Sequence, residues 1–249
     1  MTARADFMRR LRAEIGKTPG LFEAAPSPRP ARPQDRVELL RRELAERWPA
    51  TLERFRAELE RVGGVFYRVP TTAAVPDVIA GIARERAFTR LVSWDEAAVG
   101  AACTRGLDTH GIDVQTMPVG VPPMAERDRL RAAVAAADLG LTGVDLAVAE
   151  TGTLVLMSGA GRPRTTSLLP TVHVAVFDRD ALVESLEQVG LFLEAWHDGE
   201  PPVERGAVIN FITGPSRTAD IELTLTRGVH GPKEVHAIFV EQGVGGARG

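Results

Sequence analysis

The segment VHVAVFDRDALVESLEQVGLFLEAW, residues 172–196, decides the fold class. Its first six residues are mostly apolar and β-branched, which is typical of a buried strand, and the stretch from residue 180 has helical spacing. The same alternation runs through the chain from Gly63 onward. Strands that alternate with helices predict an α/β fold with a mostly parallel sheet, covered by helices on both faces.

Shorter runs of the same two kinds extend this pattern. The apolar runs 144–149 and 153–157 follow one another so closely that we expect them to pair as a hairpin. The expected strands are residues 65–69, 90–94, 113–117, 144–149, 153–157, 172–177, 207–212 and 235–240, and the expected helices are 72–87, 95–107, 125–137 and 180–196.

The residues before Gly63 show no strand pattern. Helical spacing is found in residues 2–16 and 34–60, with Pro49 expected to break or kink the second helix. Five prolines in residues 18–33 cannot continue a helix and predict an extended tether. We therefore expect a helical N-terminal appendage over residues 1–62, a single α/β domain over 63–242 and a disordered tail over 243–249.

Composition narrows the classes of protein. A net charge of −3 is too balanced for a nucleic-acid binder. The single cysteine, Cys103, cannot form an intrachain disulfide, and alone it cannot hold an iron–sulfur cluster or a four-thiolate zinc site. No ligand-type residues have the short spacing of a dedicated metal site, so we expect no metal. Because the start lacks an apolar signal-peptide core and no run approaches ~20 apolar residues, we expect a cytoplasmic protein.

Candidate site residues lie in four polar, glycine-bearing segments next to apolar runs. Ligands of open α/β sheets bind beyond the carboxyl ends of the strands, so a site is expected in such segments. The segments are AETGT (149–153), GRPRTTSLLPTVH (161–173), TGPSRTADIE (213–222) and RGVHGP (227–232).

The first two segments each have a functional and a structural interpretation. Glu150 is a candidate nucleophile or general base, with Thr151, Gly152 and Thr153 orienting an anionic or carbonyl group. The same letters also describe a hairpin turn, with Gly152 at a positive φ and Glu150 in water. In the second segment Arg164 is suited to a phosphate or carboxylate, whereas His173 is either a base or a packing residue of the strand that it opens.

The other two segments also point to anion binding. Gly214 ends a strand, and we expect a turn or new helix after it. Such a turn or helix would present backbone N–H groups and a guanidinium to an anion. The residues concerned are Ser216, Arg217 and Thr218, followed by Asp220. A helix cap with a downstream acid is the structural alternative. His230 is a candidate acid, base or oxyanion donor, or a residue of a tight turn.

Taken in order, the motifs resemble those of the LUD family in its lactate-utilisation branch. The resemblance rests on ETGT (150–153), the proline and histidine of LPTVHVAVF (169–177), TGPSRTADIE (213–222) and GVHGP (228–232). It implies a Rossmann-like α/β fold similar to ribose-5-phosphate isomerases and CoA transferases.

The resemblance also implies a role in the oxidation of L-lactate to pyruvate alongside two iron–sulfur partner proteins, with no cofactor in this chain. We expect a pocket for a small anionic ligand. Glu150 is then the catalytic carboxylate by analogy with CoA transferases, which form a thioester on a glutamate. Two alternatives stay open: a stand-alone acyl- or CoA-transferase or sugar-phosphate isomerase acting through Glu150, and a non-catalytic scaffold that docks iron–sulfur partners through its basic N-terminal helices.

Overall fold

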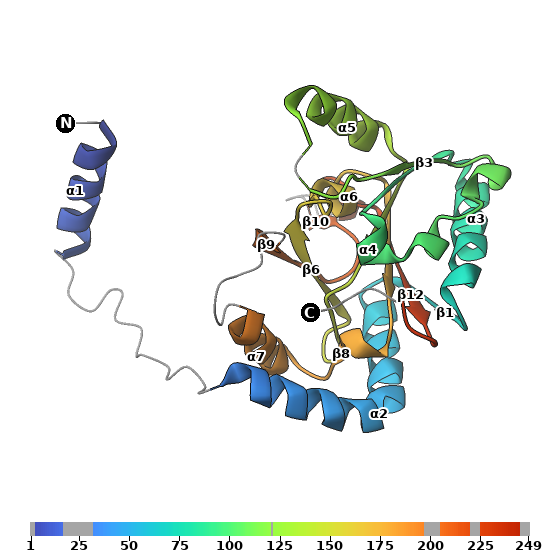
Figure 1. The fold of residues 1–249 in the computed structure, drawn as a ribbon, viewed down its shortest axis with the longest axis horizontal. Helices are drawn as coiled ribbons and strands as arrows, with labels where there is room; N and C mark the ends of the chain where they lie inside the picture. Colours follow the sequence, from blue (N-terminus) through green and yellow to red (C-terminus); the bar gives the residue numbers. More distant parts are fainter. Residues whose placement is uncertain (1–2, 17–31, 121, 197–204, 220–224, 245–249) are drawn as a thin grey trace. The chain divides into compact units, whose positions relative to one another are not determined.

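Six parallel strands form the main sheet of the computed structural model, which describes residues 3–16, 32–120, 122–196, 205–219 and 225–244 (Figure 1). The strand order is β1-β12-β7-β4-β2-β3. The strands are β1 (Val65–Val69), β2 (Arg90–Ser93), β3 (Asp113–Thr116), β4 (Leu139–Gly143), β7 (Val172–Phe177) and β12 (Glu234–Val240). This sheet confirms the predicted α/β class.

Helices cover both faces of the main sheet. On β4, Gly140 lies against α6 and Gly143 lies against α4. Because side chains alternate along a strand, these two positions point to opposite faces. The helices are α2 (Pro33–Arg61), α3 (Val75–Arg86), α4 (Glu96–Val99), α5 (Met124–Ala136), α6 (Thr165–Leu168) and α7 (Leu186–Trp196), with short 3₁₀ turns at Thr72–Ala74, Ala101–Cys103, Leu107–His110 and Arg179–Ala181.

A second sheet of four strands has the order β8-β5-β6-β9. Its strands are β5 (Leu146–Val148), β6 (Thr153–Gly159), β8 (Leu182–Val183) and β9 (Arg205–Ile212). The antiparallel pairing of β5 with β6 confirms the predicted hairpin. β9 pairs antiparallel with β6 and so lies outside the main sheet. A further hairpin joins β10 (Arg217–Ala219) to β11 (Leu225–Arg227).

Two expected helices differ from the structure, and β4, in the middle of the main sheet, was not expected. The two glycines of β4, Gly140 and Gly143, interrupt the apolar pattern. The helix expected over 95–107 is replaced by α4 and two 3₁₀ turns, since Gly100 adopts a φ of +83°. The helix expected over 180–196 begins only at Leu186, because the residues before it form a 3₁₀ turn and β8.

The chain divides into compact units at Arg32/Pro33, whereas we expected the appendage to reach residue 62. The first unit contributes α1 (Ala3–Gly16), whose Phe7 and Leu11 are exposed. The expected tether falls almost entirely on residues outside the described ranges, as does most of the tail.

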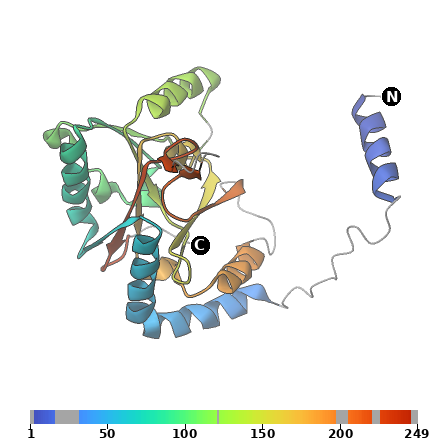
Figure 2. The same ribbon diagram turned by 180° about the vertical axis from the view of Figure 1, so that it is seen from behind.

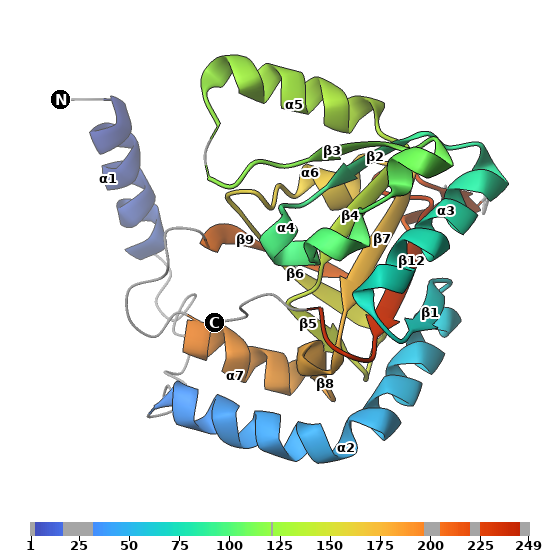
Figure 3. The same cartoon turned by 45° about the vertical axis from the view of Figure 1, so that its right-hand side comes forward.

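α2 belongs to the second unit because its C-terminal half is part of the core. Leu52, Phe55 and Leu59 are buried there, and the Phe55 ring packs edge-on against Phe177 of β7. The helix continues through Pro49, and Figure 3 shows it changing direction along its length, as a proline that lacks the N–H group allows. α7 lies beside the first half of α2, where the Gln34 amide donates to the Ala195 carbonyl at 2.7 Å (Figure 2).

The single cysteine lies in this core. Cys103 is fully buried, and burial raises the pKa of its thiol to about 12. None of the helices in the described ranges is long and apolar enough to span a bilayer.

Candidate functional site

Three of the four segments meet around one cavity of about 430 Å³. α6 and the residues before it supply one wall, and β9 with the loop after it supplies another. The lining residues are Arg164, Ser167, Leu168, Ile209, Asn210, Phe211, Ile212, Thr213, Gly214, Ser216, Arg217, His230, Gly231 and Pro232.

The cavity lies at the amino ends of β7 and β12, not at the carboxyl ends where the site was expected. Arg164 precedes β7, and His230 and Pro232 precede β12. The main chain joins the two loops, because the Lys233 N–H donates to the Thr171 carbonyl at 2.8 Å. The rule that ligands bind at the carboxyl ends of the strands applies to a single open sheet. Here a second sheet supplies one wall of the cavity.

Gly140 allows α6 to approach the sheet closely enough to form its wall. A Cβ atom at this position would lie 1.9 Å from the Thr166 carbonyl oxygen. Since this contact is to backbone, no side-chain rotation relieves it. The glycine of β4 thus sets the depth at which Ser167 and Leu168 line the cavity.

Ser216 joins the loop after β9 to the loop before β12. Its N–H donates to the Pro232 carbonyl at 2.9 Å, and its carbonyl accepts from Gly228 at 3.0 Å. Its hydroxyl accepts from the N–H of His230 at 3.3 Å. Of the turn or new helix expected here, the structure has no helix: bends at Gly214 and Pro215 lead into β10, so the loop presents its groups beside a hairpin.

The charge of the lining favours anions. Arg164, Arg217 and His230 are exposed on the cavity, and none of the lining residues is acidic. No ion pair joins either guanidinium to a carboxylate within the described ranges. Guanidinium groups present paired N–H donors that match carboxylate and phosphate oxygens.

The first segment lies away from this lining. Glu150 is exposed, and its carboxylate accepts from the Leu186 N–H at 3.0 Å, at the start of α7. Gly152 has a φ of +63°, and a Cβ there would lie 2.3 Å from the Leu59 nitrogen of α2. The segment therefore has the geometry of a hairpin turn, which was the structural interpretation of its sequence.

Its two threonines are linked to the cavity by hydroxyl contacts. The Oγ1 atoms of Thr151 and Thr153 lie 2.7 Å apart, and those of Thr153 and Thr213 also lie 2.7 Å apart. Thr213 is a lining residue, whereas Thr153 is buried. The first segment therefore reaches the cavity only through the hydroxyl of Thr213.

The remaining predicted residues fall elsewhere. His173 is buried in β7, where its Nε2 lies 2.9 Å from the Thr142 hydroxyl. Burial lowers the pKa of His173 to about 3, so the imidazole is neutral at physiological pH. Thr218 lies in β10, but its side chain is outside the description, and Asp220 lies outside the described residues altogether.

Four lining residues, Ile209 to Ile212, lie outside the four candidate segments. Asn210 and Phe211 belong to the apolar run 207–212, which predicted only a strand. The Asn210 amide donates to the Ser158 hydroxyl at 2.9 Å, and Phe211 is about half exposed. A single amide in an otherwise apolar strand was the available signal.

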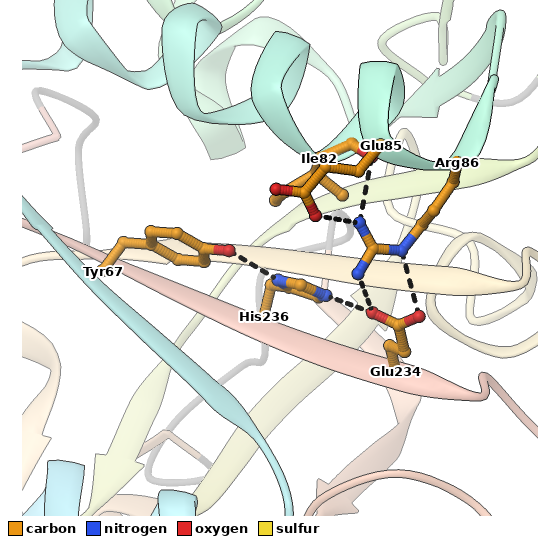
Figure 4. A network of polar contacts seen from close by, with 6 residues as sticks. All are labelled: Tyr67, Ile82, Glu85, Arg86, Glu234 and His236. Carbon is orange, nitrogen blue, oxygen red and sulfur yellow. Dashed lines mark hydrogen bonds and ion pairs between the residues drawn. The ribbon is translucent and has the colours of Figure 1, made fainter.

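A second polar cluster joins α3 to β12 and β1 (Figure 4). Arg86 donates to both carboxylate oxygens of Glu234, at 3.0 and 2.6 Å. Nε2 of His236 lies 2.9 Å from Glu234, and Nδ1 lies 3.3 Å from the Tyr67 hydroxyl. Burial lowers the pKa of His236, and the hydrogen bond from Arg86 lowers the pKa of Glu234.

This cluster contributes no residue to the cavity. In the neutral imidazole, Nε2 carries the proton that Glu234 accepts, which leaves Nδ1 to accept from Tyr67. No group of three or more metal-ligating side chains gathers anywhere in the described ranges.

Known proteins resemble this chain over most of its α/β unit. The family model described as the LUD domain matches residues 52–240. Lactate utilization protein C of Halalkalibacterium halodurans is 36% identical over 167 residues, which cover 66% of this chain and 67% of that protein. Lactate utilization protein C of a Geobacillus species is 41% identical over 108 residues, or 42% of each chain. The match thus spans less than half of the length of the second relative.

A solved structure has a similar fold. A crystal structure of a DUF162 family protein from Deinococcus radiodurans superposes with a TM-score of 0.51 at 22% identity, covering 78% of this chain and 98% of that one.

Proposed function

The chain belongs to the LUD domain family, and from this premise we propose that it is the component of an L-lactate utilisation system that carries no iron–sulfur cluster. The observation that carries the proposal is the set of relatives named lactate utilization protein C, at 36% and 41% identity. One buried cysteine cannot supply the thiolates of a cluster. Electron transfer through clusters is therefore assigned to partner proteins.

Within this system, the cavity binds a carboxylate. Arg164 and Arg217 lie in its lining without an acidic neighbour there, so a ligand carboxylate is the natural counter-charge. His230 adds an imidazole at the same cavity. Catalysis by Glu150 is not part of the proposal, because its carboxylate is bonded at the start of α7 and away from the lining.

Growth tests the role in lactate utilisation. Deletion of the gene is expected to abolish growth on L-lactate as the sole carbon source while growth on pyruvate persists, and the intact gene should restore growth. Unchanged growth of the deletion strain on L-lactate overturns the proposed role.

Calorimetry tests the anion site. Titrations of L-lactate, pyruvate and inorganic phosphate are expected to show binding that Arg217→Ala weakens by about 10- to 100-fold, the range for a lost charge-assisted pair. Arg131→Ala is the matched control, because this arginine lies on the exposed surface of α5. Equal affinity of the Arg217→Ala and Arg131→Ala variants for every anion contradicts the assignment.

A further inference from the structure

The outer edge of β9 borders the cavity. β9 is the last strand of its sheet, with β6 as its neighbour on the inner side. Six consecutive residues, Ile209 to Gly214, line the cavity. The first four are the last residues of β9, and the other two belong to the loop after it. Because side chains of a strand alternate between its two faces, four consecutive strand residues border one cavity along the edge or the end of the strand.

This edge has open hydrogen-bonding capacity. Alternate residues of an edge strand turn both N–H and C=O away from the neighbouring strand. Within the described part of the chain, no main-chain hydrogen bond reaches β9 from outside its sheet. An unpaired edge of this kind is a template for an added strand, which is a common mode of peptide binding.

The cavity is larger than a three-carbon acid requires. A water molecule occupies about 30 Å³ in the liquid. Even if each of the six non-hydrogen atoms of lactate is given that volume, lactate fills less than half of the cavity. The cavity measures about 430 Å³ and borders the last four residues of β9. An extended main chain uses both this space and the polar edge, whereas a hydroxy acid uses neither fully.

Two of the three cationic lining residues, Arg217 and His230, lie at one end of the edge. Arg217 and Ser216 follow the point where β9 ends, and His230 is held to Ser216 by its N–H. Capture of a terminal carboxylate at such a position fixes the register of a bound segment. Phe211 and Val208 are 49% and 46% exposed and lie an odd number of residues apart, so they offer apolar contact on both faces of an added strand.

We propose that the cavity receives the carboxyl-terminal segment of a partner protein, which binds as an extended strand along β9 with its terminal carboxylate at Arg217 and with Arg164 as a further cation of the same cavity. The inference rests on the proposed function, because it names the molecule whose carboxylate the anion site binds. It makes this chain a receptor for a protein terminus within the lactate-utilisation system.

A library of displayed seven-residue peptides with free carboxyl termini tests the inference. Selection on the wild-type chain is expected to yield peptides that bind Arg164→Ala/Arg217→Ala at least 10-fold more weakly and Arg131→Ala unchanged. Amidation of their carboxyl terminus should cause a comparable loss. Absence of any selected peptide, or equal binding of the amidated forms, overturns the inference.

Hydrogen exchange followed by NMR supplies a readout specific to the strand edge. Amides at alternate positions of β9 are expected to exchange rapidly in the free chain and slowly with a selected peptide bound. Protection of those amides already in the free chain overturns the inference, because the edge is then occupied.

The small anions separate this inference from the proposed function. If L-lactate binds in an Arg217-dependent manner and no peptide is selected, the anion site stands and the strand inference fails. If selected peptides bind but deletion leaves growth on L-lactate unchanged, the role in lactate utilisation fails and the docking site stands.

Discussion

At the scale of single residues, the sequence located the polar loops but could not show which of them come together. Glu150 and Arg217 both follow apolar runs in glycine-bearing loops, and their local patterns are equivalent. The difference arises from distant parts of the chain. Glu150 meets the Leu186 N–H of α7, whereas Arg217 meets a cavity that also contains Arg164 and His230.

The buried imidazole of His173 makes stability depend on pH. Its pKa is about 3 in the folded chain and near 6.5 when unfolded, so the unfolded state binds more protons between these values. Stability is therefore lost as the pH falls below 6.5. The contribution of His173 amounts to about 2 kcal/mol between pH 7 and pH 5.

Urea unfolding at pH 7, 6 and 5 measures this effect. His173→Gln, which keeps a polar partner for Thr142 but does not titrate, should be less sensitive to acid than the wild type by about 2 kcal/mol over that range. Identical pH dependence of the two chains would show that His173 is not held neutral.

At the scale of elements, the close approach of α6 to β4 explains why the sequence did not predict this strand. β4 contains two glycines, which lower the strand propensity of its sequence, yet it pairs with both β2 and β7 in the middle of the sheet. Only the position of α6 shows why Gly140 is required. The strands β5, β6, β7 and β12 were predictable because their apolar runs are uninterrupted.

Gly140→Ala should damage both the fold and the cavity. The new methyl group must displace α6, and overpacking of this kind costs about 3 kcal/mol. Because α6 carries Ser167 and Leu168, anion binding should fall as well. Thermal unfolding and calorimetry measure the two effects.

Gly190→Ala is the matched control for this substitution. This glycine is exposed in α7, and nothing lies within 4 Å of its would-be Cβ atom. We expect it to gain about 0.5–1 kcal/mol of stability, because alanine favours the helix. A stable Gly140→Ala chain that binds anions normally would contradict the role assigned to β4.

Glu150→Gln should affect α7 and leave the cavity unchanged. A carboxylate that accepts from the first turn of a helix stabilises it by about 0.5 kcal/mol, and the amide retains only part of this. Chemical denaturation should detect the small loss, while calorimetry should show unchanged anion affinity. Normal stability with lost anion binding would return Glu150 to the site.

At the scale of the whole molecule, the boundary between the two units reflects where the apolar surface is buried. The sequence showed that helices precede the first strand but not which of them joins the core. α2 joins it because Trp48 stacks on Phe239 with ring centroids 5.6 Å apart, and because Phe55 reaches Phe177. Helical periodicity identifies an apolar face but not the surface that it contacts.

Truncation distinguishes what α1 and α2 each contribute to the stability of the fold. A chain that starts at Pro33 is expected to unfold at the same temperature as the full chain, because the second unit keeps all of its core. A chain that starts at Val62 should not fold, since it lacks Leu52, Phe55 and Leu59. Circular dichroism during heating decides both cases, and a folded chain without α2 would contradict this description of the core.

The burial of Cys103 has a practical consequence for studying this molecule. A thiol with a pKa of about 12 and no solvent exposure does not react with maleimides while the chain is folded. A cysteine introduced on the surface can therefore be labelled selectively with a fluorophore or spin label, because Cys103 does not react. The native thiol reacts only when the core opens, so its labelling rate serves as a built-in clock for global unfolding.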